Sequence, residues 1–139
     1  MKVLGFVKIA LFLVVLLATT ACSDRNYIDY RNTDEELCNK EWIRDVVLNE
    51  KTGEWYRCIF KFYENGKCDR TNAYYEEGKS KPVSSETFYD IGWRWADDSK
   101  ERIVLSNKTI VTYFDNVMVR DHYLTGVLDG EAVMFTDYQ

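Results

Sequence analysis

The sequence predicts an all-β fold: an eight-stranded antiparallel meander that closes into a barrel, with a short N-terminal helix before it. Two observations predict this fold. From residue 41 onward, runs of β-branched and aromatic residues alternate with turn signals at roughly eight- to twelve-residue spacing. A meander also leaves its first and last strands with exposed edges, which closure into a barrel removes. A two-sheet sandwich is the alternative that uses the same pattern.

The N-terminus, residues 1–21, has the layout of a secretory signal peptide. Lys2 and Lys8 give it a positive start, residues 9–18 contain no charged or polar side chain, and small residues precede Cys22. The apolar run is short for a membrane-spanning helix, which needs about 20 residues. We therefore expect cleavage, with an uncleaved anchor as the alternative.

Two cleavage sites compete at this position. One is an ordinary cut after Ala21, and the other makes Cys22 the lipidated first residue of a bacterial lipoprotein. The stretch "TTAC", residues 19–22, resembles the relaxed lipobox of Bacteroidetes lipoproteins. We favour lipidation, because the apolar run ends directly before a cysteine. Several acyl chains would hold the domain on a membrane of the bacterial cell envelope, most simply the outer membrane, on its periplasmic or its surface face.

The charge of the mature chain bears on its partners. The full chain carries −5, and loss of Lys2 and Lys8 without any acidic residue moves this to −7. A strongly acidic protein lacks the basic face that nucleic acid requires. The same charge is compatible with a basic protein partner.

The domain is expected to follow a polar tether. Residues 22–32 are polar and without periodicity, and residues 33–139 form the barrel domain. The helix begins at Thr33, whose hydroxyl caps it, and Glu36 completes a capping box. Strands are then predicted over residues 42–48, 55–63 and 67–76, and in the second of these Tyr56, Cys58, Phe60 and Phe62 share one face.

The cysteines limit the disulfides that can form. With Cys22 used for lipid, Cys38, Cys58 and Cys68 remain, so at most one bridge forms. The turn before Cys68 has two registers: a two-residue loop Asn65-Gly66, or a three-residue loop 64–66 with Phe62 opposite Cys68. Both exclude a Cys58–Cys68 bridge, because the two residues lie on opposite faces or roughly 13 Å apart. Cys58 is expected to be a buried free thiol, and any bridge is Cys38–Cys68.

The C-terminal half predicts strands over residues 87–96 and 102–106, then three strands joined by two-residue turns. Asp115-Asn116 and Asp129-Gly130 both tolerate the positive φ that such turns need. With these turns, alternation places on the interior face Ile110, Thr112, Phe114, Val117, Val119, Asp121, Tyr123, Thr125, Val127, Ala132, Met134 and Thr136. In the strand over residues 87–96 the corresponding face carries Tyr89, Ile91, Trp93 and Trp95.

Two segments carry a family resemblance. "LCNKEWI", residues 37–43, resembles the short helix and tryptophan that open lipocalin-like domains. "FKFYENGKC", residues 60–68, is similar to the F-x-F-x-x-x-G hairpin of small lipocalin-like lipoproteins of Bacteroidetes. The resemblance extends over residues 36–138 and implies a barrel, often with an apolar pocket.

The candidate ligand site combines two kinds of side chain, since ligand pockets place few polar groups in an apolar wall. Asp121 would be the polar anchor and the Trp93/Trp95 pair would stack on the ligand. The alternatives are a barrel rim or bulge for Asp121 and a core position for the tryptophans. The predicted ligand-binding residues are Tyr89, Trp93, Trp95, Thr112, Asp121 and Tyr123.

No pattern in the sequence indicates an enzyme. His122 is the only histidine, lies on the predicted outer face and has no nucleophile elbow or Gly-rich loop near it. We expect no catalytic residue, no cofactor and no metal site. Two functions remain: a membrane-tethered binding module for a small, mainly apolar ligand, and a protein-interaction module of the cell envelope, such as an inhibitor or an accessory subunit.

Overall fold

The computed structural model describes residues 31–138, and the predicted all-β barrel is confirmed. The predictions for residues 1–21, for Cys22 and for most of the tether concern residues outside this range. The described chain forms one closed eight-stranded antiparallel barrel and one short helix. The elements are α2 (Asp34–Cys38), β1 (Glu41–Asn49), β2 (Glu54–Phe62), β3 (Lys67–Tyr75), β4 (Ser84–Trp95), β5 (Ile103–Ser106), β6 (Val111–Val119), β7 (Tyr123–Leu128) and β8 (Glu131–Thr136).

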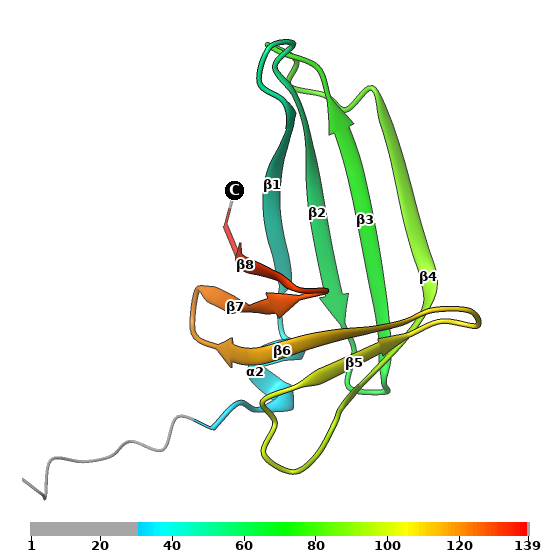
Figure 1. The fold of residues 1–139 in the computed structure, drawn as a ribbon, viewed down its shortest axis with the longest axis vertical. Coiled ribbons are helices and arrows are strands. Elements are labelled where there is room, and N and C mark those ends of the chain that lie inside the picture. Colours follow the sequence, from blue (N-terminus) through cyan, green and yellow to red (C-terminus); the bar gives the residue numbers. More distant parts are fainter. Residues whose placement is uncertain (1–30, 139) are drawn as a thin grey trace, which may run out of the picture. The chain divides into compact units, whose positions relative to one another are not determined.

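The barrel has two unequal halves (Figure 1). Strands β1–β4, the long half, have nine to twelve residues each. Strands β5–β8, the short half, have four to nine. Among the described residues, β8 pairs with β1 only at Thr136 and Ile43. On the other side, β4 pairs with β5 only over Gly92–Trp95.

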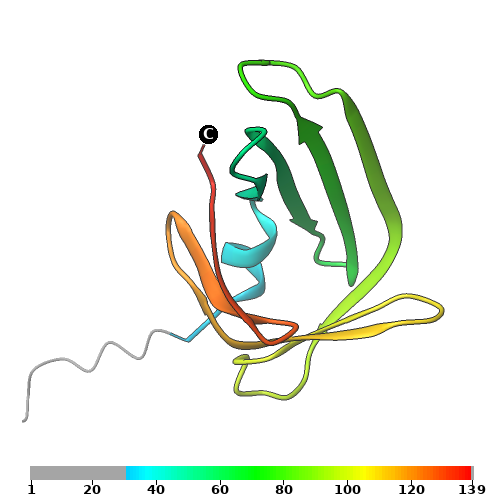
Figure 2. The same cartoon turned by 45° about the horizontal axis from the view of Figure 1, so that its top comes forward.

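The long half consequently extends past the short half at one end, which we call the open end (Figures 1 and 2). The segments Arg44–Asn49 of β1 and Ser84–Ile91 of β4 are paired on one side only in the described chain. At the opposite, closed end, α2 lies under the barrel and the strands of both halves pack together. The two ends therefore differ in how far the inner face is covered.

The apolar core fills the closed end. Its largest fully buried side chains are Trp42, Phe62, Phe114 and Phe135. The aromatic rings meet edge to face, as in the Phe62–Trp93 pair at 5.7 Å between centroids. Leu37 of α2 seals the end, and its carbonyl accepts a hydrogen bond from Trp42 Nε1 at 2.9 Å.

Asn32 ties the start of the domain to the closed end. Its side-chain amide nitrogen donates to the carbonyls of Lys100 (2.6 Å) and Val117 (2.7 Å), and its oxygen accepts from the Val119 N–H at 2.8 Å. The side chain is buried. The last residue that the sequence assigned to the tether is therefore a packed part of the barrel. The next residue, Thr33, caps α2 and bonds Glu36 as predicted.

The β2–β3 hairpin has the three-residue register. Phe62 pairs with Cys68, the Tyr63 N–H donates to the Lys67 carbonyl, and Gly66 has φ +85°. Only glycine adopts this left-handed conformation at no steric cost. Cys58 pairs with Asn72 and is a buried free thiol, as predicted. The structure also holds Cys38 and Cys68 as free thiols.

The prediction of a turn at Asp115-Asn116 is wrong. Strand β6 continues through these residues, and a β-bulge absorbs Asn116 with φ +50°. Asp115 pairs with Val127 and Met118 with Thr125, so two residues of β6 face Gly126. The positive φ that suggested a turn is used inside a strand.

An unpredicted turn after β6 explains a second error, in the faces of β7 and β8. Val119 pairs with Leu124 and the Arg120 N–H donates to the Tyr123 carbonyl, so a two-residue turn at 121–122 separates β6 from β7. Such a turn moves the inward positions from odd-numbered Val119 to even-numbered Leu124, whereas the prediction continued one strand through these residues. Leu124, Val133 and Phe135 are buried inside, whereas Tyr123 and Met134 are exposed outside. The Asp129-Gly130 turn is confirmed, and the predicted pairs Val127–Ala132 and Thr125–Met134 are present.

Candidate functional site

The six residues of the predicted ligand site do not lie together. Trp93 is buried and its indole N–H donates to the Tyr63 carbonyl at 2.7 Å. Trp95 is half-buried and donates to Asp34 Oδ1 at 2.7 Å. The two rings contact each other edge to face at 6.0 Å. Both tryptophans thus occupy core positions with their polar atoms already bonded.

Tyr89 does not share the face of Trp93. Between Cys68–Ile91 and Arg70–Phe88, strand β4 has one residue more than β3, and this irregularity changes the alternation. Tyr89 is 71% exposed as a result. Its predicted position on the inner face is wrong, while Ile91, Trp93 and Trp95 lie on that face against the core.

Asp121 and Tyr123 are also outside the barrel, contrary to prediction. Asp121 is exposed in the β6–β7 connection, where its carbonyl accepts a hydrogen bond from Lys40 Nζ. Tyr123 is exposed and its hydroxyl lies 3.1 Å from that of Tyr138. Thr112, half-buried on β6, keeps an inward position at its predicted face, as Trp93 and Trp95 do.

His122 is an exposed surface residue, as predicted. Its Nδ1 lies 3.1 Å from both carboxylate oxygens of Asp137, which also accepts from Lys40 Nζ at 3.1 Å. Desolvation opposes ionisation of Asp137, but the hydrogen bonds from His122 and Lys40 outweigh it and lower the pKa of this carboxyl. Within residues 31–138 no three histidine, cysteine or acidic side chains are grouped to hold a metal ion.

A different set of side chains converges on the inner face of the long half near the open end. We call this set the open inner face. The cross-strand pairs Arg44–Cys58–Asn72–Glu86 form one row, and Val46–Tyr56–Tyr74–Ser84 form the next row outward. Arg70 stands in the row below, opposite Phe60. Alternation along each strand puts these residues on the side of the buried Phe60 and Phe62.

Arg70 is the central cation of this face. Its guanidinium lies 5.6 Å from the Phe60 ring centroid, and its Nε is 3.4 Å from Asn72 Oδ1. It is half-buried, and no carboxylate of the described chain lies within ion-pair distance of it. Arg70 therefore has a neutral surrounding of a ring and an amide.

Arg44 is the second cation, on the neighbouring side of β2. Its Nη2 donates to Glu131 Oε1 at 2.8 Å. Glu131 is the first residue of β8, and the tight Asp129-Gly130 turn brings it to the mouth of the barrel. A carboxylate of the short half thus already forms an ion pair with one guanidinium of the long half.

Both arginines affect the pKa of the Cys58 thiol. Burial raises the pKa of its thiol, while Arg70 and Arg44 act in the opposite direction. Because Cys58 lies on β2 between β1 and β3, the two cations flank it. Positive charge thus lies on both sides of Cys58, from Arg44 in the same row and from Arg70 in the row below.

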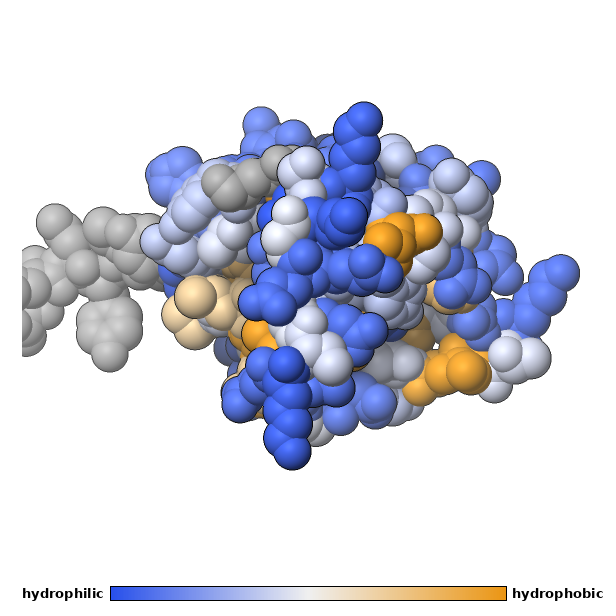
Figure 3. Space-filling model, turned by 90° about the horizontal axis from the view of Figure 1, so that it is seen from above, coloured by the Kyte–Doolittle hydropathy of each residue, from blue (hydrophilic) through white to orange (hydrophobic). Residues whose placement is uncertain are grey.

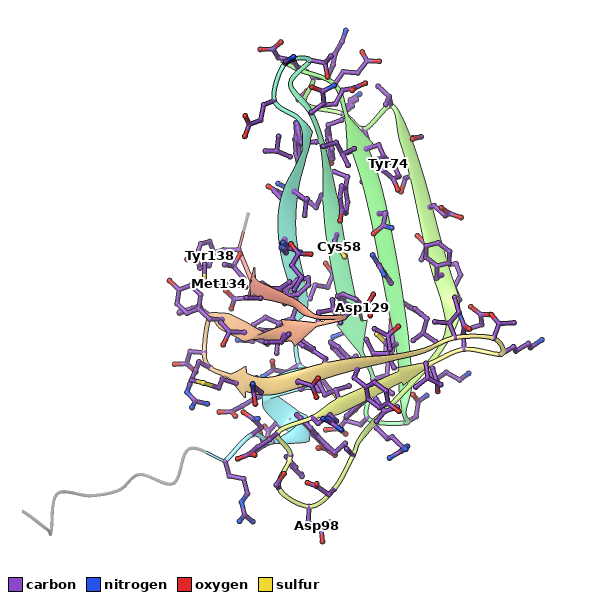
Figure 4. All side chains as sticks on the ribbon, in the orientation of Figure 1. Cys58, Tyr74, Asp98, Asp129, Met134 and Tyr138 are labelled. Carbon is purple, nitrogen blue, oxygen red and sulfur yellow. The ribbon has the colours of Figure 1, made fainter. Side chains whose placement is uncertain are left out.

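The outermost row is aromatic. Tyr56 and Tyr74 pair across β2 and β3 with ring centroids 5.7 Å apart. Both are half-buried, and Figure 4 shows Tyr74 further toward the open end than Cys58. Seen from this end, the molecule is largely hydrophilic with separate hydrophobic patches (Figure 3). The open inner face therefore combines ring surface, amide and cation.

Two further surfaces present charged or apolar groups. An open groove of about 600 Å³ lies between the β4–β5 connection and the β6 bulge. Its charged groups are largely engaged with one another, since Arg102 pairs with Asp115 and Asp97 accepts from Ser99. The outer face of β6–β8 exposes Met118, Met134, Tyr123 and Tyr138.

The residues of the open inner face were missed because the sequence analysis looked for aromatic and acidic positions in the C-terminal half. The sequence of the β2–β3 hairpin did contain a signal for this face. With Phe62 opposite Cys68, alternation places Arg70, Asn72 and Tyr74 on the face of Cys58. Polar and cationic residues at inward positions of a barrel strand are the pattern that identifies this face.

Comparison with family models, with characterised proteins and with solved structures found no match to this chain.

None of the helices in residues 31–138 has the length and apolar character needed to cross a bilayer.

Proposed function

We propose that this protein is an exported, lipid-anchored binding module of the bacterial cell envelope that holds a small ligand on its open inner face. The observation that carries the proposal is the uncovered part of the long half. It carries Tyr56, Tyr74 and Arg70 on its inner face, in the region where β1 and β4 have no pairing partner in the short half. The resemblance to small lipocalin-like lipoproteins agrees with this role.

The ligand position differs from the one expected from the sequence. At the closed end the barrel is occupied by packed aromatic side chains such as Phe62, Trp93 and Phe114. Interiors at native density leave no room for a ligand among such rings. At the open end the rings of Tyr56 and Tyr74 are only half-buried, so an apolar or aromatic ligand body can cover their exposed part.

The proposed anchor agrees with access to this face. The domain is held at Asn32, at the closed end, and Cys22 precedes Asn32 by ten residues. A chain of that length has an end-to-end distance of roughly 17 Å when flexible. A lipid on Cys22 would therefore join the chain to the membrane through the closed end, away from the proposed ligand residues in the fold.

Cell fractionation tests the anchor. Cys22→Ser should move the protein from the membrane fraction to the soluble fraction, provided that the leader is still removed. Cys38→Ser is the matched control and should leave the protein with the membranes. A wild-type protein that is soluble and has an unmodified N-terminal cysteine would refute lipidation.

The ligand site is tested with the uncharged fluorescent probe N-phenyl-1-naphthylamine. We expect saturable fluorescence enhancement with the mature Cys22→Ser protein, and loss of most of it with Tyr74→Ala. Tyr113→Ala removes an equally large, exposed ring from the outside of β6 and should leave the titration unchanged. Equal effects of both substitutions, or no saturable binding, would contradict a site on the open inner face.

A protein-interaction module is the second candidate function. The observation that favours it is the exposed apolar outer face of β6–β8, where Met118 and Met134 stand on either side of Thr125. Together with the acidic charge, it suits a basic envelope protein as partner. Capture of such a partner should weaken as salt rises, because surface charges are screened within about 8 Å at physiological ionic strength. Capture of a partner that does not weaken with salt would contradict an electrostatic contribution to the interaction.

A further inference from the structure

We propose that the ligand of the open inner face carries one anionic group, a carboxylate, sulfonate or phosphate, which Arg70 binds together with Arg44. The inference rests on the proposed function, since it names the ligand class of the same face. It replaces the mainly apolar ligand expected from the sequence by an amphiphile with an aromatic or apolar body and a charged end.

The first step of the argument is the uncompensated charge of Arg70. A guanidinium that is partly removed from water loses hydration, and an opposite charge with good hydrogen-bond geometry restores the balance. The contacts of Arg70 in the described chain are with uncharged groups: the Phe60 ring, the Asn72 amide oxygen at a long distance, and the Cys58 thiol. The remaining N–H groups of its planar fork are suited to two parallel bonds to an anion.

The second step is the carboxylate that already lies at the mouth. Glu131 reaches from the β7–β8 hairpin to Arg44 at 2.8 Å, with most of its own side chain exposed. This contact demonstrates that a carboxylate fits between the hairpin and the long half. A ligand anion that approaches from the open end would meet Arg44 by displacing or joining Glu131.

The third step is convergence. Arg44 and Arg70 belong to β1 and β3, which flank β2, and neighbouring strands lie about 4.8 Å apart. Both guanidinium groups act on the Cys58 thiol between them. One anion placed above Cys58 can therefore interact with both cations, while its apolar body lies against Tyr56 and Tyr74 in the next row outward.

The acidic residues of the same face restrict the ligand further. Glu86 pairs across the strands with Asn72 and is exposed toward the open end, and Glu131 stands at the hairpin. These two carboxylates repel a second negative charge on the ligand. The face thus favours a small molecule with a single anionic group over a polyanion.

Two probes that differ by one group test the inference. The probe 8-anilino-1-naphthalenesulfonate and N-phenyl-1-naphthylamine share their rings, and only the former carries a sulfonate. Both are titrated against the mature Cys22→Ser protein and against Arg70→Gln, Arg44→Gln and Glu131→Gln. Arg94→Gln is the matched control, because it removes the same charge from an exposed position on the outside of β4.

We expect Arg70→Gln to weaken binding of the sulfonate probe about tenfold or more, because the substitution removes charge-assisted hydrogen bonds to the sulfonate. The uncharged probe should change less than about twofold, within the range of surface substitutions. Arg44 contacts no core ring, and Arg44→Gln should also weaken binding of the sulfonate probe. Glu131→Gln should strengthen the sulfonate probe, because it frees Arg44. Arg94→Gln should affect neither probe.

The outcomes separate this inference from the proposed function. If both probes bind and Arg70→Gln and Arg44→Gln alter the sulfonate probe no more than Arg94→Gln does, the anion inference is overturned while ligand binding stands. If neither probe binds the wild-type sequence, both are overturned. Weaker sulfonate binding by Glu131→Gln would also contradict the assigned role of Arg44.

Discussion

The long and the short halves of the barrel share one antiparallel ladder but use their inner faces differently. On β2, Phe62 is 1% exposed among core rings, whereas Tyr56, six residues earlier on the same face, is half-buried. On β8, Val133 and Phe135 are buried and the strand ends its pairing with β1 after a single pair. Strand length beyond the partner strands, rather than residue type, decides which inner side chains become core.

This difference indicates that stability and ligand binding depend on different parts of the molecule. The closed end has ring-to-ring packing, a capped helix and the buried Asn32 amide, all of which stabilise the fold. The open inner face has cations and tyrosines whose contacts contribute less to folding. Substitutions at the two ends are therefore expected to have different consequences for stability and for ligand binding.

The largest effect is expected from matched truncations on β2. Phe62→Ala removes a fully buried ring and should lower the free energy of unfolding by about 3–5 kcal/mol. Tyr56→Ala removes a half-buried ring at the open end and should cost about 1 kcal/mol. Urea denaturation followed by circular dichroism measures both. Equal losses would mean that the open inner face is part of the stabilising core.

Asn32→Ala tests the attachment of the chain to the closed end. It leaves the Val119 N–H and the Val117 carbonyl without their partner. The expected cost is about 3 kcal/mol, at the upper end for unsatisfied buried groups. Asn39→Ala, at an exposed position after α2, is the control and should be near neutral. A neutral Asn32→Ala would show that the segment before Thr33 is not packed as described.

Gly126→Ala tests the bulge in the short half. An added Cβ would lie 2.6 Å from the Asp115 carbonyl oxygen and 2.7 Å from the Phe114 ring. The overpacking should cost about 1–3 kcal/mol. At Gly92 the nearest atoms to a Cβ are 3.7 Å away, so Gly92→Ala should be tolerated. Unfolding curves that reverse this order would place the β6–β7 register in error.

The smallest effect concerns the rate at which the thiols react. Burial, with nearby acidic groups, raises the pKa of Cys38 to about 11. Its alkylation rate should therefore keep rising up to about pH 11, whereas an ordinary thiol with pKa near 8.5 levels off about two pH units earlier. Cys58 and Cys68 are buried and should react only after unfolding. Recovery of a Cys58–Cys68 linked peptide would be incompatible with the observed hairpin register.

Much of the fold follows from local patterns in the sequence. The helix cap at Thr33, the alternation of Tyr56 to Phe62 and the Asp129-Gly130 turn each depend on neighbouring residues, and each was predicted. The bulges at Tyr89 and Asn116 depend on contacts with strands far along the chain, such as the close approach of Gly126. Because side chains alternate with period two, the bulge in β4 changed the predicted face of Tyr89, and the unpredicted turn at 121–122 changed the predicted faces of β7 and β8.

The candidate site was less predictable than the fold. Its location depends on how far β1–β4 extend past β5–β8, and strand ends are set by pairing partners rather than by the strand's own residues. Arg44 resembles any surface arginine in the sequence, and its contact with Glu131 joins residues 87 positions apart. Trp93 and Trp95 were predicted as ligand-binding residues because they are aromatic, but their hydrogen-bonded indole N–H groups place them in the core.

The central claim is that the open inner face binds the ligand and the closed end is a filled core. The most direct measurement is a two-dimensional ¹H–¹⁵N NMR titration of the mature Cys22→Ser protein with N-phenyl-1-naphthylamine. The account predicts shifts at the backbone amides of Tyr56, Asn72 and Tyr74, with the indole N–H signals of Trp93 and Trp95 unchanged. Shifts concentrated at those indoles, or at Met134 and Tyr138 on the outer face, would contradict it.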